Sequence, residues 1–399
     1  MDCSRHSILM VNVFRVACGI ATRVDETPDF KLQRVPVGDQ RGVVDHKNGK
    51  RKASSPTSAS SRAVDCARTP TGRTRARRCE RELKPDVGFD DVLAAGARIA
   101  GKLHRTPVHN SRTLDAELGC ASFFKCENLQ KVGAFKARGA TNAVFALDEA
   151  SASQGVVTHS SGNHAAAHAF ASALRGIRCT VVMPRGAPDV KVAAVRGYGA
   201  EIVFCEPAER EATCARLAAQ TGAELVHPFE DPRVIAGQGT AALELLEQVP
   251  ELDLVIAPVG GGGLLSGTAI TVAAMRPGAR VLGAEPAAVD DAARSMHSGV
   301  RQPRVPDPRT ICDGLLTAIG ARPFTILRAF GIEILTAEES AIRDAARTFV
   351  ERLKLVVEPS GAVPLAVLRT HRERFAGKRV GVIVSGGNTD FRWLCEPGN

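Results

Sequence analysis

Runs of β-branched and other apolar residues alternate with alanine-rich segments of helical periodicity along most of this 399-residue chain. The runs expected to form strands are 121–125, 155–159, 179–183, 202–205, 252–258, 280–284, 332–335 and 379–384. The segments expected to form helices are 89–103, 163–174, 189–198, 209–220, 235–248, 264–275, 337–353 and 362–370. Parallel strands need a long crossover between them, which a helix usually provides. The alternation therefore predicts an α/β fold, with parallel-rich twisted sheets flanked by helices.

The first 85 residues differ in composition from the rest of the chain. They contain 18 Lys and Arg against 9 Asp and Glu, whereas the remaining residues contain 34 basic and 34 acidic side chains. Segment 47–81 is rich in Ser, Arg, Pro and Thr and poor in large apolar residues, which is typical of a disordered chain. We expect residues 1–85 to form a disordered, basic N-terminal extension. Because the remainder is electrically balanced, nucleic acid is not an expected partner.

Cysteine usage and hydropathy indicate a reduced compartment. The 11 cysteines are scattered, and no two are spaced as Cys-x-x-Cys, which disfavours a zinc ribbon or a redox motif. An odd number of cysteines in a long chain fits a reduced protein better than a disulfide-bonded one. No apolar run reaches the roughly 18 residues that a membrane-spanning helix needs. We therefore expect a cytoplasmic protein with no membrane partner.

Four consecutive glycines stand between a predicted strand and a predicted helix; they are Gly260, Gly261, Gly262 and Gly263. Backbone N–H groups without neighbouring side chains can surround an anion, and the dipole of the following helix adds positive potential. A dinucleotide site is the alternative, but the spacing is not Gly-x-Gly-x-x-Gly. The run therefore predicts a phosphate site.

Two further polar turns follow predicted strands, at the edge where open α/β sheets bind ligands. The first is Ser160, Ser161, Gly162, Asn163 and His164, and the second is Ser385 to Asn388. Helix capping explains one polar residue of the first turn but not the cluster. Ser160, Ser161, Asn163 and His164 are therefore candidate substrate contacts. The spacing of His164 and His168 could bind zinc, but no Glu follows His164 as the His-Glu-x-x-His pattern requires, so we interpret this pair as structural. Ser385 can hydrogen-bond to a ring nitrogen, but a neutral serine cannot hold that nitrogen protonated as an aspartate would.

Lys136 falls in the first turns of a helical segment that begins near Gly133. The N-terminal end of a helix disfavours a cation. A solvated lysine is the simpler interpretation of this residue alone. An amine with a lowered pKa, able to form a Schiff base, is the other interpretation. The three glycine-containing turns favour the second one.

Two acids flank the loop that follows predicted strand 280–284. Glu285 and Asp291, together with a carbonyl such as that of Val289, can bind a hard cation such as Mg²⁺ or Ca²⁺. Asp291 also fits the start of a helix. The residues alone leave both interpretations open.

Together these motifs resemble the fold-type II pyridoxal-phosphate enzymes, in the branch that contains serine/threonine dehydratases and serine racemase. The resemblance extends from about residue 89 to residue 390. It also includes Phe135-Lys136, residues 235–240, Glu285-Pro286 and Glu358-Pro359, in the family's order. It implies a two-lobed, tryptophan-synthase-β-like architecture and a homodimer. Residues 86–150 and 232–399 would form the large cofactor-binding domain, and residues 151–231 a small inserted α/β domain.

The resemblance assigns a role to each matching residue. Lys136 would hold pyridoxal 5'-phosphate covalently and move the α-proton, and Ser161 would act on the opposite face. Phe135 would pack on the cofactor ring, Asn163 would contact its hydroxyl, the four glycines would hold its phosphate and Ser385 would face its pyridine nitrogen. Glu285, the carbonyl of Val289 and Asp291 would bind Mg²⁺, Mn²⁺ or Ca²⁺.

A few positions depart from the family's pattern. Ala134 stands where the family often has Ser or Thr, and Ala166 where it often has Gln. Phe229 follows His227-Pro228, as in many dehydratases, and Cys312 replaces the alanine of an Ala-Asp-Gly turn. The sequence continues for only a short stretch after Asn388, so we expect no regulatory domain like that of the feedback-controlled threonine dehydratases.

The activity that the resemblance implies is β-elimination of water from L-threonine or L-serine. The products would be 2-oxobutanoate or pyruvate and ammonia, so the chain would be a lyase acting on a small amino acid. Serine racemisation and dehydration of another 3-hydroxy amino acid, such as 3-hydroxyaspartate, are the alternatives within the family. A non-catalytic sensor on the same fold is an alternative from another class, and the presence of Lys136, Ser161 and Ser385 disfavours it.

Overall fold

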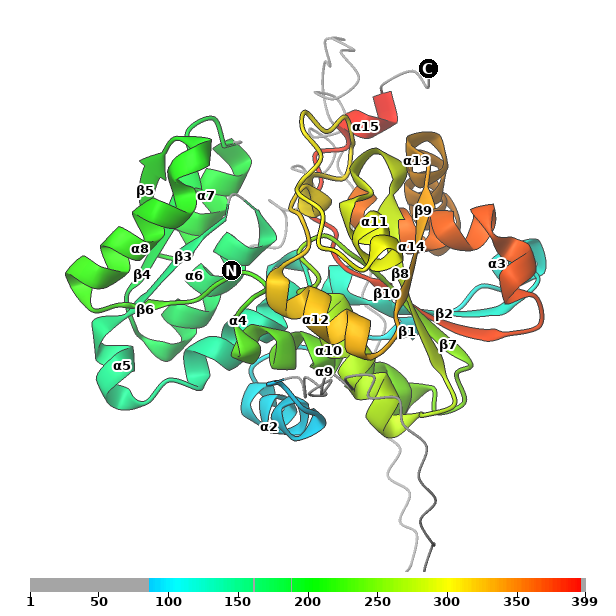
Figure 1. Cartoon of the computed structure of the whole chain (residues 1–399), viewed down its shortest axis with the longest axis horizontal. Coiled ribbons are helices and arrows are strands. Elements are labelled where there is room, and N and C mark those ends of the chain that lie inside the picture. Colours follow the sequence, from blue (N-terminus) through cyan, green and yellow to red (C-terminus); the bar gives the residue numbers. More distant parts are fainter. Residues whose placement is uncertain (1–85, 161, 188, 396–399) are drawn as a thin grey trace, which may run out of the picture. The chain divides into compact units, whose positions relative to one another are not determined.

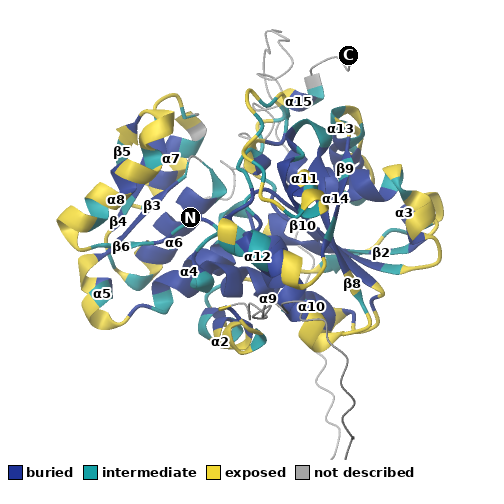
Figure 2. Cartoon of the chain, in the orientation of Figure 1, coloured by how far each residue is buried: buried dark blue, intermediate teal, exposed yellow. Residues whose placement is uncertain are grey.

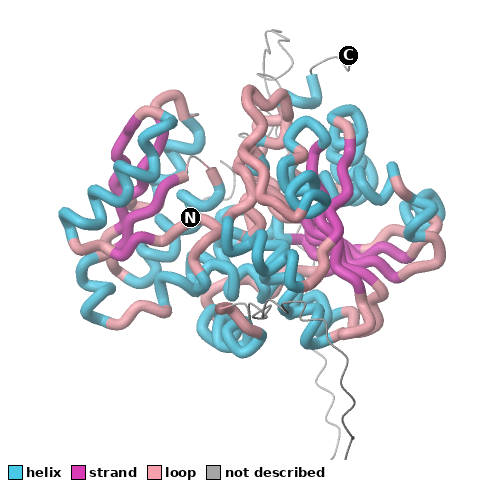
Figure 3. Tube along the Cα trace, in the orientation of Figure 1, coloured by secondary structure: helices cyan, strands magenta, loops and turns pink. Residues whose placement is uncertain are grey.

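The computed structural model describes residues 86–395 except 161 and 188, all within one compact unit, Leu83–Asn399. The expected disordered extension, 1–85, lies outside the described residues. Two sheets form, one of six strands in the order β1-β2-β10-β7-β8-β9 and one of four strands in the order β5-β4-β3-β6 (Figures 1 and 3). All neighbouring strands are parallel except β1 and β2. The prediction of an α/β fold with parallel-rich sheets is confirmed.

We call the six-stranded sheet and its helices the large lobe, and the four-stranded sheet and its helices the small lobe. The strands of the large lobe are β1 (Val108–His109), β2 (Ala121–Cys126), β7 (Leu254–Pro258), β8 (Arg280–Pro286), β9 (Glu333–Ala337) and β10 (Arg379–Val384). The strands of the small lobe are β3 (Val156–His159), β4 (Cys179–Pro184), β5 (Glu201–Cys205) and β6 (Glu224–Leu225). The sequence did not predict β1 and β6, because each strand has only two residues, too few to show the alternation of a strand.

Helices connect the strands in both lobes. They are α2 (Phe89–Ile99), α3 (Arg112–Leu118), α4 (Lys136–Phe145), α5 (Glu149–Gln154), α6 (Asn163–Arg175), α7 (Asp189–Gly197), α8 (Arg210–Thr221), α9 (Pro232–Gln248), α10 (Gly263–Met275), α11 (Asp291–Ser298), α12 (Ala321–Ala329), α13 (Glu339–Thr348), α14 (Pro359–Thr370) and α15 (Arg392–Cys395). The helix expected over 337–353 is shorter, since α13 gives way to a π-helical turn in which Phe349 packs edge-on against Phe124. No helix in the described part of the chain is both long and apolar enough to cross a membrane.

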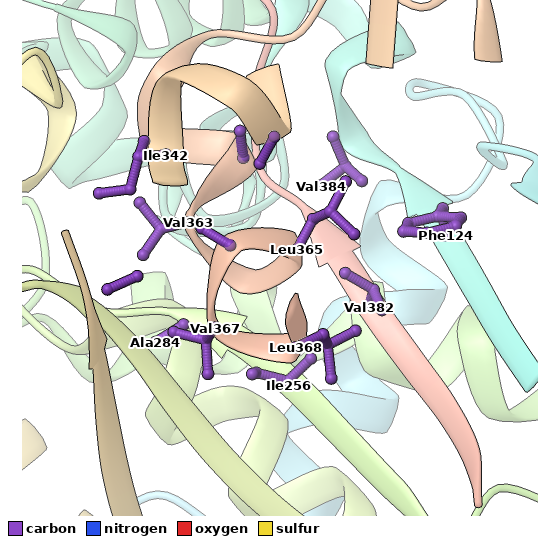
Figure 4. Packing of buried hydrophobic residues seen from close by; sticks show 14 of the residues in the cluster. Phe124, Ile256, Ala284, Ile342, Val363, Leu365, Val367, Leu368, Val382 and Val384 are labelled. Atoms are coloured by element: carbon purple, nitrogen blue, oxygen red, sulfur yellow. The ribbon is translucent and has the colours of Figure 1, made fainter. Parts of the chain in front are cut away.

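The core of the large lobe is buried on both faces of its sheet. Along β10, Val382 and Val384 belong to one apolar cluster, and Ile383 between them belongs to another. Figure 4 shows Leu365 and Leu368 of α14 beside these valines, and in Figure 2 the helix and the sheet are both dark blue. Side chains that alternate between two apolar layers explain why these strands read as continuous apolar runs.

A buried ionic network joins α4 to the large lobe. The guanidinium of Arg138 donates to both oxygens of Glu127 at 2.7 and 2.8 Å and to both oxygens of Glu244 at 2.7 and 2.9 Å. Lys125 donates to Glu244 at 2.6 Å, and Thr106 donates to Glu127 at 2.6 Å. Because an unpaired charge inside a protein is costly, these partners hold α4, α9 and the end of β2 in one arrangement.

The network makes a prediction about stability. The substitution Glu127→Gln leaves the buried Arg138 with half of its counter-charge, so we expect the free energy of unfolding to fall by about 3 kcal/mol. Urea denaturation followed by circular dichroism measures the loss. Glu333→Gln is the control, because Glu333 pairs with Arg374 at the surface, where a loss below about 1 kcal/mol is expected. Equal losses in the two variants would contradict the assigned importance of the network.

Candidate active site

A cavity of about 750 Å³ opens where the carboxyl ends of several parallel strands meet. Its lining includes His159 at the end of β3, Pro184 at the end of β4, Pro258 at the end of β7 and Ser385 just after β10. The cavity thus draws residues from both sheets, at the edge where open α/β sheets bind ligands. All the candidate cofactor residues that the sequence indicated line this cavity; they are Phe135, Lys136, Asn163, Gly260, Gly261, Gly262, Gly263 and Ser385.

Lys136 is the first residue of α4, so this helix begins later than the expected start near Gly133. The Nζ atom of Lys136 donates to the carbonyl oxygen of Pro228 at 3.0 Å and lies 5.2 Å from the centre of the Phe135 ring. Burial lowers the pKa of Lys136 to about 8, because a buried amine loses the hydration of its charged form. The neutral form that a nucleophile or a base requires is therefore far more populated near physiological pH than in an ordinary lysine.

The glycine run has free N–H groups and no room for side chains. Among the described residues, no acceptor binds the N–H groups of Gly260, Gly261 or Gly262. A Cβ on Gly261 would lie 2.2 Å from the ring of Phe229, and Gly262 has a φ of 89°. Helix α10 begins at Gly263, so its positive end faces the same place. Unused donors at a helix start fit a bound phosphate group.

The polar turn before α6 supplies further groups to the cavity. The hydroxyl of Ser160 accepts a hydrogen bond from the N–H of Gly162 at 3.1 Å. Ser161 lies outside the described residues. His164 is buried, and its Nε2 lies 3.1 Å from the hydroxyl of Thr158, whose proton goes to the carbonyl of Val226. One ring nitrogen of His164 is therefore engaged within the small lobe, whereas Nδ1 has no partner among the described residues and the residue lines the cavity. Burial holds the pKa of His164 well below the usual value.

Glu358, which the sequence indicated only as part of a family motif, is hydrogen-bonded to the polar turn before α6. Glu358, just before α14, accepts hydrogen bonds from the amide of Asn163 at 3.0 and 3.1 Å. The amide oxygen of Asn163 accepts from Asn388 at 2.9 Å. Burial, and secondly the charge of Asp313, raise the pKa of Glu358 to about 7. This carboxyl can therefore hold or release a proton near neutral pH.

The two acids of the candidate cation site are both buried, and each accepts hydrogen bonds from backbone N–H groups. Glu285, near the end of β8, accepts from the N–H groups of Ala292 and Ala293 at 3.0 and 2.8 Å. Asp291 accepts from the N–H of Ile319 at 3.0 Å. Burial, with a smaller contribution from the charge of Asp291, raises the pKa of Glu285 to about 8. Among the described residues neither acid forms an ion pair, and two buried carboxyl groups of this kind fit a divalent cation.

Several arginines line the cavity that the sequence did not indicate as site residues. Arg185, Arg210, Arg301 and Arg304 all line it. In the sequence nothing distinguishes them from ordinary surface arginines. They line one cavity only because the chain segments that carry them are packed around it. Lys191 of α7 also lines the cavity and forms an ion pair with Asp313, which links the small lobe to the large one.

Comparison with known proteins defines the class. Residues 99–386 match the family model described as pyridoxal-phosphate dependent enzyme. The chain is 51% identical over 307 residues to a β-hydroxyaspartate dehydratase of Paracoccus denitrificans, a match that covers 76% of this chain and 96% of the relative. The crystal structure of serine racemase from Dictyostelium discoideum has 46% identity and a TM-score of 0.73, covering 76% of this chain and 99% of that one. The crystal structure of a threonine deaminase from T.th. has the same identity, TM-score and coverage.

The chain therefore belongs to the pyridoxal-phosphate dependent enzymes. Its relatives are ammonia-lyases and racemases of amino acids, so the predicted cofactor, lyase class and type of substrate are confirmed. The resemblance drawn from the sequence motifs is confirmed as well. The lowered pKa of Lys136 and the free N–H groups of the glycine run fit the aldehyde and the phosphate of pyridoxal phosphate, respectively.

The pKa of Lys136 yields a pH prediction. Only the neutral amine attacks an aldehyde, so cofactor-free protein should bind pyridoxal phosphate faster as the pH rises, with a midpoint near the pKa of about 8. Stopped-flow absorbance in the visible range measures the rate. An ordinary lysine would show no plateau below about pH 10. Lys136→Ala is the control, and we expect neither visible absorbance nor turnover from it; ammonia release by this variant would contradict the role of Lys136.

Proposed function

We propose that this protein is an ammonia-lyase that removes water from a 3-hydroxy amino acid, and that 3-hydroxyaspartate fits its cavity best. The observation that carries the proposal is the presence of a buried amine of lowered pKa, Lys136, and a glycine run with free N–H groups in the lining of one cavity. L-Threonine and L-serine are substrates of the same chemistry with smaller side chains. The family relationship supports the class of reaction, and the charges of the cavity support the choice of substrate.

In this proposal the chain's own groups bind the substrate and move its protons. Bound pyridoxal phosphate supplies an electron sink conjugated with the substrate's α-carbon. The N–H groups at the start of α6, next to Ser160 and Asn163, bind the α-carboxylate. Lys136, oriented by the carbonyl of Pro228, takes the α-proton. Phe135 would pack against the cofactor ring, and the neutral hydroxyl of Ser385 would be the partner of its nitrogen, which would favour prompt loss of the β-hydroxyl. That hydroxyl would leave as water after taking a proton from an acid of the cavity, for which Glu358 has a suitable pKa of about 7.

The substrate preference follows from unpaired positive charge. Among the described residues, Arg210, Arg301 and Arg304 form no ion pair, although each lines the cavity. Arg210 is half-buried, and its Nε donates to the carbonyl of Pro207 at 3.1 Å. A guanidinium whose other N–H groups are free pairs well with a carboxylate. The second carboxylate of 3-hydroxyaspartate would satisfy it, and the reaction would give oxaloacetate and ammonia.

This preference predicts a selective loss of activity. Arg210→Ala should lower kcat/KM for 3-hydroxyaspartate by about 50-fold, the value of a hydrogen bond between charged groups, with little change for L-serine. Coupled assays of oxaloacetate, pyruvate and ammonia measure both substrates. Arg216→Ala is the matched control, because Arg216 lies on the same helix, is exposed and does not line the cavity. Equal losses for both substrates would contradict the assigned carboxylate contact.

Serine racemisation is the second activity to measure, since serine racemase is among the similar structures. Racemisation needs a proton donor on the face of the substrate opposite Lys136. We propose Ser161 as this donor, because it stands in the sequence just before α6, next to Ser160 and Gly162. D-Serine and pyruvate formed from one incubation with L-serine separate racemisation from elimination.

We also propose a divalent cation at Glu285, Asp291 and the carbonyl of Val289, with Mg²⁺, Mn²⁺ and Ca²⁺ as candidates. Buried carboxyl groups with raised pKa values support the site.

We propose two domains, a large one of residues 86–150 and 232–399 and a small one of residues 151–231. Closure of the small domain would exclude water from the cavity. A cytoplasmic homodimer completes the proposal.

The proposed cation site predicts that the stability of the folded protein depends on both pH and Mg²⁺. The pKa of Glu285 is about 8 in the folded protein against 4.5 for the ordinary group, so chelator-treated protein should lose stability as the pH rises from 4.5 to about 8. Mg²⁺ should restore it. In Glu285→Gln the Mg²⁺ effect should disappear and the loss of stability with rising pH should become smaller, because Glu358 also has a raised pKa and contributes the remainder. Asp290→Asn, which removes a more exposed neighbouring acid, should leave both effects unchanged. Thermal unfolding with and without chelator measures both, and a Mg²⁺ effect that survives Glu285→Gln would place the cation elsewhere.

A further inference from the structure

Three side chains with metal-binding atoms converge on the small-lobe side of the cavity. They are His159 at the end of β3, Glu211 in the first turn of α8 and His227 after β6. One ligand atom from each lies within 4.8 Å of the other two. The rings of His159 and His227 meet edge to face, with centres 5.1 Å apart. The proposed reaction uses none of these three groups.

The two imidazoles are neutral, and one of them lacks a partner. His159 is only 8% exposed, and its Nε2 forms no hydrogen bond within the described part of the chain. Burial lowers the pKa of His159 below the usual value and that of His227 to about 4. Neutral imidazole nitrogens are free to bind a metal without first losing a proton, and a buried unsatisfied nitrogen gains most from doing so.

The type of ligand decides which metal fits. Two imidazoles and one carboxylate form a set typical of zinc sites that keep an open fourth position. Nitrogen ligands favour Zn²⁺ and neighbouring transition metals over Mg²⁺, whereas the oxygen-only set at Glu285 and Asp291 has the opposite preference. The two sets would therefore bind different metals in the same molecule.

One feature limits the strength of binding. The Nδ1 atom of His227 accepts from the N–H groups of Glu230 at 3.2 Å and Phe229 at 3.4 Å, so the proton of the ring is on Nε2. A metal at Nε2 would require that proton to move to Nδ1, which would then no longer accept these two long hydrogen bonds. The positive charge of Lys136 also acts on His227. A reversible site of moderate affinity follows, rather than a permanently occupied structural site.

We propose that His159, Glu211 and His227 form a binding site for a borderline transition-metal ion such as Zn²⁺, and that the bound ion inhibits the enzyme. His227 directly precedes Pro228, whose carbonyl holds the amine of Lys136. An ion bound there would occupy part of the same cavity that Lys136 lines and that substrate must enter. Zinc thus excludes substrate without touching the cation site at Glu285.

The test uses the cofactor-loaded enzyme in the presence of millimolar Mg²⁺. Calorimetric titration with ZnCl₂, without substrate, should show a site with a dissociation constant on the order of 1–10 μM. Zinc should inhibit turnover over the same concentration range, competitively with substrate. Glu211→Gln and His227→Asn should each weaken binding and inhibition by about tenfold or more. Unchanged circular dichroism and visible absorbance establish that these variants are folded.

Glu209→Gln is the matched control. It removes an exposed acid two residues from Glu211 that does not line the cavity, and zinc binding should be unchanged. Zinc binding that persists in Glu211→Gln and His227→Asn, or that disappears in Glu285→Gln, would overturn the proposal, as would the absence of binding. Because the calorimetry needs no substrate, its result does not depend on whether 3-hydroxyaspartate is turned over.

Discussion

The buried guanidinium of Arg138 determines where the reactive amine can be. Arg138 stands two residues after Lys136 on α4, and four hydrogen bonds to Glu127 and Glu244 fix its position. On the other side of Lys136, the N–H of Phe135 donates to the carbonyl of Ser385 at 2.9 Å. The amine is therefore held between a charge network that is costly to break and a backbone bond to the end of β10. Its distance from the glycine run depends on both.

The cavity combines neutral groups that could be charged with charged groups that lack partners. Burial gives Lys136 a larger neutral fraction than an ordinary lysine has and allows Glu358 to hold a proton near pH 7, since water is excluded from both. The arginines that line the same cavity stay charged at all relevant pH values. The roles are thus divided between Lys136 and Glu358, which can exchange protons, and the arginines, which attract an anionic substrate. This division suits elimination from a doubly charged amino acid, because charge recognition does not disturb the pKa values needed for proton transfer.

Much of the fold, and about half of the site, could be predicted from the sequence. The burial of a strand such as β10 shows in its continuous apolar run, and four consecutive glycines indicate an anion site by residue type alone. Glu358, Arg210 and the cluster of His159, Glu211 and His227 could not be found in this way. Glu211 and His227 belong to different segments of the small lobe, and no local periodicity indicates that their side chains converge. Arg210 begins an amphipathic helix, where an arginine is ordinary. Such residues acquire a function only from the packing of one element on another.

Two kinds of ionic link therefore serve different purposes in this molecule. The network of Arg138 is buried, and breaking it would leave charges without water or partners. The pair of Lys191 and Asp313, which joins the lobes across the cavity, is partly exposed, so water replaces each partner at small cost. The same two charges act in opposite directions on Glu358, because Asp313 raises its pKa and Lys191 lowers it. A weak link across the cavity and a strong one at α4 would let the small lobe close, as proposed above, while Lys136 stays in place, which is what a cavity that must admit substrate and then exclude water requires.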